Sequence, residues 1–125
     1  MRLRSILLAA ALVANASLVP AIAEQGHGTS KAVTVQGEIL DLVCFVAHDG
    51  KGPKHAACAA KCLKQGQPMG LLAKDGTVYI LFGDHDDVAA FVKAKEFVAR
   101  NVEIVGTVAN HDGMKGIIVT SVKPL

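Results

Sequence analysis

Apolar residues recur along this chain with two spacings, one typical of strands and one typical of helices. Apolar and β-branched residues dominate residues 33–46, which predicts a long strand, and Gly37 within it predicts a bend. Four shorter apolar runs have strand character and are bounded by Gly, Asn and Asp. They predict strands at residues 69–73, 77–82, 102–109 and 117–122.

Two segments between these strands have helical spacing. Pro53 suits the first position of a helix and Gly66 suits the residue after the last one, which predicts a helix over residues 53–65. A second helix is predicted over residues 87–100, after an acidic run at 84–87 that suits a helix N-terminus.

The order of these elements predicts a mainly β domain over residues 32–125, preceded by a flexible polar lead at 24–31. Five strands with the principal helix between the third and fourth match the order of an OB-fold barrel. The helix at 53–65 is then an insertion in the first loop. We therefore predict a five-stranded, OB-fold-like barrel with two helices.

The first 23 residues have the three parts of a signal peptide. Arg2 and Arg4 form a positive start, and residues 6–19 form an uncharged apolar run that is too short to span a bilayer. Ala21 and Ala23 then provide the small residues that signal peptidase requires. We expect cleavage after residue 23 and a periplasmic or secreted protein with no stable membrane anchor.

Net charge and the absence of common motifs argue against nucleic-acid binding and against several classes of enzyme. Loss of Arg2 and Arg4 leaves 11 of the 13 basic residues against 11 acidic ones, so the mature net charge is about zero. A nucleic-acid binder needs a basic face, which this composition does not supply. The sequence also contains none of the common hydrolase, metalloprotease, P-loop or dinucleotide-binding motifs, so we do not expect an enzyme.

The candidate chemistry lies in three cysteines and one histidine: Cys44, His55, Cys58 and Cys62. On a helix, the last three share a face within about 60°. We expect this face to point inward, where Cys44, near the end of the first strand, can meet it. Three thiols and one imidazole form a complete ligand set for Zn(II) and also suit Cu(I).

The spacing of these residues argues against a single metal ion bound by all four of them. His55 and Cys62 are seven residues apart, which corresponds to about 10.5 Å along a helix. A set of two or three ligands drawn from the cysteines is therefore an equal alternative to the full set. Among the other histidines, His48 precedes a turn and is expected to be solvated, while His85 lies in the predicted helix cap.

Two further interpretations remain open. A disulfide from Cys44 to Cys58 or Cys62 would stabilise a small exported domain by about 2–4 kcal/mol. The protein would then be an interaction module with a protein partner in the periplasm. Alternatively, His55 and Cys58, one helical turn apart, can form the core of a thiol-based redox enzyme, although no third catalytic group is evident.

Two resemblances bear on these alternatives. The segments Val35–Ile39 and Val102–Val108 resemble those of small exported bacterial OB-fold proteins, and the whole mature chain is similar to secreted bacterial domains without an established activity. The resemblance implies the OB fold. The Cys-x3-Cys pair with a more distant histidine also resembles the copper site of Sco-type copper chaperones, in that fragment alone.

Overall fold

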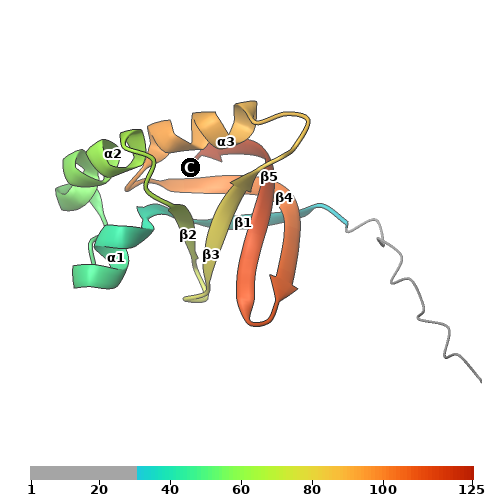
Figure 1. Ribbon diagram of the computed structural model, residues 1–125, viewed down its shortest axis with the longest axis horizontal. Coiled ribbons are helices and arrows are strands. Elements are labelled where there is room, and N and C mark those ends of the chain that lie inside the picture. Colours follow the sequence, from blue (N-terminus) through green and yellow to red (C-terminus); the bar gives the residue numbers. More distant parts are fainter. Residues whose placement is uncertain (1–30) are drawn as a thin grey trace, which may run out of the picture.

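The computed structural model describes residues 31–125, so the predicted signal peptide and nearly all of the polar lead lie outside the described residues. Within that range the chain forms five strands, three α-helices and two short 3-10 helices (Figure 1). No helix of residues 31–125 is long and apolar enough to cross a membrane. The elements are β1 (Val33–Asp41), α1 (Leu42–His48), η1 (Pro53–His55), α2 (Ala56–Lys64), β2 (Met69–Ala73), β3 (Val78–Gly83), α3 (Ala89–Ala94), η2 (Lys95–Phe97), β4 (Asn101–His111) and β5 (Met114–Pro124).

The five strands close into a barrel in the order β1-β2-β3-β5-β4, with β4 returning to β1. All neighbours are antiparallel except β3 and β5, which are parallel. Strand β1 pairs with two neighbours along its length: residues 33–38 pair with β4 and residues 37–41 pair with β2. The change of partner occurs at Gly37, where an added Cβ would overlap the carbonyl of Leu72. The bend predicted at Gly37 therefore coincides with the point where the strand is shared.

Two hairpins have the turn chemistry that the sequence indicates. Gly76, with φ 85°, completes the turn between β2 and β3, and the Ala73 N–H donates to the Thr77 carbonyl at 2.9 Å. Asp112 and Gly113 both have positive φ between β4 and β5. Such a two-residue turn lets both strands run close to it. Strands β4 and β5 are consequently longer than predicted.

The prediction of a strand over residues 33–46 is wrong at its end. Strand β1 stops at Asp41, and the next seven residues form α1. The Asp41 carboxylate caps this helix by accepting from the Val43 N–H at 3.0 Å. Asp49, with φ 56°, ends it. The predicted count of two helices is wrong for the same reason, since α1 is an additional one.

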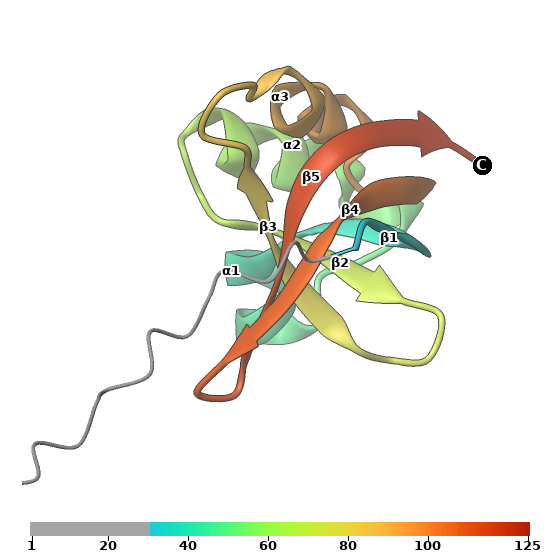
Figure 2. The same ribbon diagram turned by 90° about the vertical axis from the view of Figure 1, so that its right-hand side faces the viewer.

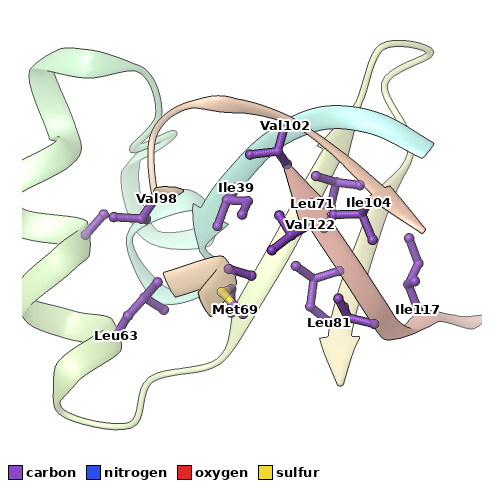
Figure 3. Close-up of a cluster of buried hydrophobic side chains, with 13 residues drawn as sticks. Ile39, Leu63, Met69, Leu71, Leu81, Val98, Val102, Ile104, Ile117 and Val122 are labelled. Atoms are coloured by element: carbon purple, nitrogen blue, oxygen red, sulfur yellow. The ribbon is translucent and has the colours of Figure 1, made fainter. Parts of the chain in front are cut away.

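The core fills the barrel and extends beneath the helices (Figure 3). Helix α3 packs against β3 and β5, while α1 and α2 lie together at one side of the molecule (Figures 1 and 2). Helix α2 contributes Ala59 and Leu63 to the core, where Leu63 is only 2% exposed. Burial of a leucine stabilises by about 1.5–3 kcal/mol. This packing fixes α2, and with it the cysteines on its adjacent face.

Candidate metal centre

Cys44 is the central thiol of the site. It lies in α1, is buried, and has its Sγ 3.9 Å from the Sγ of Cys58 and 3.9 Å from the Sγ of Cys62. Both partners belong to α2. The predicted meeting of Cys44 with this helix is confirmed, but Cys44 approaches from α1 rather than from the end of a strand.

The loop and helix that carry the other ligands are held at both ends. The Glu38 carboxylate of β1 accepts a short hydrogen bond from the Gly52 N–H, which ties the loop before Pro53 to the barrel. At the other end Gly66, with φ 89°, donates its N–H to the Leu63 carbonyl. The helical segment begins at Pro53 and ends before Gly66 as predicted, but its first turn, Pro53–His55, is the 3-10 helix η1, and α2 begins at Ala56.

Three ligand atoms converge on the solvent side of Cys44. The ligand atoms of Cys44, His55 and Cys58 all lie within 4.8 Å of one another, and we call these residues the outer set. With Zn–S bonds of about 2.3 Å, two sulfurs on a tetrahedral zinc are about 3.8 Å apart. The observed 3.9 Å between Cys44 and Cys58 is close to that spacing. Cys58 is exposed, so this set is open to solvent on one side and does not point wholly inward as predicted.

The histidine of the outer set is positioned by its neighbours but lacks a hydrogen-bond partner. His55 Nε2 is buried and unpaired. The ring packs against Gly50, where even a single added carbon would lie 2.7 Å from Nε2. The ring of His48, which is exposed as expected, meets that of His55 edge-on with centroids 5.1 Å apart. A ring nitrogen held in this way is available as a ligand.

A second group of ligand atoms lies on the inner side of Cys44. Asp41, Cys44 and Cys62 place their ligand atoms within 4.8 Å of one another, and we call them the inner set. Asp41 is 1% exposed. Its Oδ1 caps α1 through Val43, whereas its Oδ2 is buried without a hydrogen-bond partner.

The proximity of the carboxylate and the thiols shifts their pKa values. Burial works to raise the pKa of Asp41, but polar contacts with the Cys44 thiol and the Val43 N–H outweigh it, and the pKa lies below its usual value. The Asp41 carboxylate, followed by burial, raises the pKa of Cys44 far above that of an ordinary thiol. Burial and then Asp41 raise the pKa of Cys62 as well. Both thiols are therefore protonated at neutral pH unless a cation replaces the protons.

The four predicted ligands are brought together in part. Cys44 meets all of the others, but His55 and Cys62 fall in different sets, as their seven-residue separation suggests. All three thiols are free, because 3.9 Å is about twice the length of an S–S bond. Sequence reasoning missed Asp41. Its signal was its position three residues before Cys44, as the cap of a helix that was read as strand.

The acidic run at 84–87 lies directly before α3, as predicted, but the N-cap residue of this helix is Val88, without a side-chain capping hydrogen bond. Asp87 Oδ1 accepts from the Ala89 N–H at 2.8 Å, at the start of α3. His85, in the same run, lines a cavity of about 340 Å³ with His111 and Met114. None of these residues belongs to the two sets.

Comparisons with known proteins gave no match: no family model matches the chain, and no curated protein or solved structure is significantly similar to it. The function is therefore inferred from the geometry of the outer and inner sets.

Proposed function

We propose that this protein is a small exported binding protein that takes up a soft metal ion, Cu(I) or Zn(II), at the outer set of Cys44, His55 and Cys58. Cys62 supports the site from its inner side. The protein handles the metal rather than catalysing a reaction. Export follows from the predicted signal peptide over residues 1–23.

The observation that carries this proposal is the convergence of two sulfurs and one imidazole nitrogen within 4.8 Å, on a ring whose Nε2 is buried and has no hydrogen-bond partner. A buried polar atom without a partner is costly, and such atoms in folded proteins are usually satisfied. A metal ion bound to the imidazole of His55 through Nε2 would satisfy that atom. It would also replace the protons that neutralise the thiols.

The donor set favours soft and borderline ions over hard ones. Thiolate and imidazole suit Cu(I) and Zn(II), whereas Mg(II) and Ca(II) prefer oxygen ligands. Cu(I) is satisfied by two or three such ligands, and Zn(II) takes a fourth, which a solvent molecule can supply at the exposed side near Cys58. A site of this openness suits transfer of the ion to another molecule.

The pKa values of Cys44 and Cys62 favour metal binding over thiol catalysis by these two residues. A catalytic cysteine needs a lowered pKa, because the thiolate is the nucleophile. The pKa values of Cys44 and Cys62 are raised instead. A metal cation stabilises the thiolate directly and so does not need a low pKa in the free protein.

We further propose that the barrel is an OB fold that displays this site on the insertion between β1 and β2. The strand order, the parallel pair of β3 and β5, and the position of α3 between β3 and β4 support this assignment. The barrel then serves as a rigid support for the two short helices that hold the ligands.

The test is metal uptake by reduced, metal-free protein, measured by competition with a chromophoric chelator for Zn(II) and with a Cu(I)-specific chelator for Cu(I). We expect tight binding of at least one of the two ions. Cys58→Ser and His55→Ala should each weaken it about 100-fold or more, since each removes a ligand. His111→Ala, which changes an exposed histidine outside both sets, should bind like the wild type.

Two results would overturn the proposal. One is the absence of uptake of either ion by protein with three reduced thiols. The other is uptake that His55→Ala and Cys58→Ser leave unchanged, since binding would then lie elsewhere. A single free thiol in protein isolated without reductant would instead favour the disulfide-stabilised interaction module.

A further inference from the structure

We infer that Asp41, Cys44 and Cys62 hold a second metal ion, so that the site is a two-ion zinc centre in which the Cys44 thiolate bridges the inner and outer positions. This inference rests on the proposed function, because the outer ion shares Cys44 with the inner one. It adds a metal position and a ligand, Asp41, that the sequence did not indicate.

Asp41 supplies the first argument. The carboxylate is 1% exposed, and its two oxygens have different surroundings. Oδ1 accepts from the Val43 N–H at 3.0 Å and so caps α1, whereas Oδ2 is buried and has no hydrogen-bond partner. Capping alone needs one oxygen and is performed equally well by an asparagine or a serine. A carboxylate oxygen of Asp41 lies within 4.8 Å of the thiols of Cys44 and Cys62.

The separation of the two sets supplies the second argument. Cys58 belongs only to the outer set and Cys62 only to the inner one, while Cys44 is 3.9 Å from each of their sulfurs. A single tetrahedral ion would need all its ligands at one centre. Two positions that share one sulfur fit the observed grouping without rearrangement. Metal ions in such paired sites lie about 3.5–4 Å apart.

Charge supplies the third argument. Three thiolates and one carboxylate carry four negative charges, and the neutral imidazole of His55 adds none. With one divalent ion at the outer set, Cys62 keeps its proton, but the negative charge of the buried Asp41 carboxylate stays uncompensated, which is unfavourable. Two divalent ions compensate all four. This balance selects Zn(II) over Cu(I) for the doubly loaded state.

The experiment is a Zn(II) titration of the reduced, metal-free protein, followed by native mass spectrometry, which counts bound ions. We expect two ions per chain. Loading with ¹¹³Cd(II) should give two NMR signals, coupled to each other through the bridging sulfur. Asp41→Asn should retain the outer ion and weaken the inner one about 100-fold or more. Because asparagine also caps helices well, this variant keeps α1 folded, which circular dichroism can verify.

Matched variants separate this inference from the proposed function. Cys62→Ser should reduce the count to one, and Asp112→Asn, a change at an exposed turn residue, should leave it at two. A wild-type count of one, or a count of two that survives Asp41→Asn with unchanged affinity, would overturn the second position. The proposed function would still stand if that one ion is lost in His55→Ala and Cys58→Ser. A count of zero would overturn both.

Discussion

The Sγ atom of Cys44 lies 3.9 Å from the Sγ atom of Cys58, although 14 positions separate the two residues in the sequence. Cys44 is buried on α1, and Cys58 is exposed on α2. The contact therefore joins the interior of the site to its surface. In the proposed site, an ion that arrives from solvent would meet Cys58 first and Cys44 next. Cys44 is also the residue that both sets share.

Replacement of Cys44 by serine should weaken metal binding more than replacement of either other cysteine. Cys44 belongs to both sets, whereas Cys58 and Cys62 belong to one each. Competition with a chromophoric chelator measures the affinities of the three variants under the same conditions. Equal losses in Cys44→Ser and Cys62→Ser would contradict a shared role for Cys44.

Oxidation of the metal-free protein should produce a disulfide that always includes Cys44. The Cys44 sulfur is 3.9 Å from the sulfurs of Cys58 and Cys62. Neither set contains both Cys58 and Cys62. Side chains four residues apart on a helix are also poorly oriented for a disulfide. Peptide mapping by mass spectrometry after mild oxidation identifies the bridge, and zinc should slow its formation. A bridge from Cys58 to Cys62 would contradict the observed grouping.

Metal-free, reduced protein should lose stability as the pH rises above about 8.5. The Asp41 carboxylate and burial raise the pKa of Cys44, so folding holds this thiol protonated while the unfolded chain releases its proton. The stabilisation is present below the unfolded pKa and is lost as the pH rises toward the folded one. Denaturant unfolding at pH 7.5 and at pH 10 measures the change.

Asp41→Asn is the control for that pH dependence. It removes the carboxylate that contributes most to the raised pKa of Cys44, so its loss of stability between the two pH values should be smaller. Ionisations elsewhere in the chain affect both proteins equally. The same alkaline loss in both proteins would show that the carboxylate does not control the thiol.

Leu63→Ala should destabilise the domain by about 2–5 kcal/mol, because it removes a side chain that is 2% exposed and anchors α2 to the barrel. Lys64→Ala, at an exposed position next to it, should change stability by less than about 0.5 kcal/mol. Thermal unfolding of the metal-free proteins measures both. A small effect at Leu63 would mean that α2 is held by other contacts.

Turn residues and helix-limiting residues in the sequence correctly predicted one hairpin turn and the limits of one helical segment. Asp75 and Gly76 set the β2–β3 turn, and Pro53 and Gly66 set the limits of the helical segment that includes α2. The region after β1 could not be read in this way. Residues 42–48 are rich in valine and other apolar residues that favour strands, and the cap provided by Asp41 outweighs this preference.

The candidate site was predictable to the extent that it depends on spacing along one helix. Cys58 and Cys62 lie on α2 as expected, whereas His55 lies in η1 just before it. The seven-residue separation left open whether His55 and Cys62 share one centre, and the structure places them in different groups of ligand atoms. Asp41 was not predictable as a ligand. Its carboxylate meets the thiols only because the chain changes from strand to helix at that residue, which brings the cap and Cys44 together.

Gly50→Ala tests whether the position of His55 matters, without removing any ligand. An added Cβ would lie 2.7 Å from His55 Nε2 and 3.0 Å from the Cβ of Cys44. Because the imidazole is the far end of a flexible side chain, we expect it to move while the fold is retained. Metal affinity at the outer set should fall about tenfold or more, as ligands lose affinity when their supporting contacts change.

The double variant decides whether this loss acts through His55. If the added methyl group acts by displacing the imidazole, Gly50→Ala should have little further effect on affinity in a His55→Ala background. Chelator competition on the wild type, both single variants and the double variant completes the cycle. Fully additive losses would show that Gly50 acts on the site through Cys44 or the backbone, and His55 would then not depend on Gly50 for its position.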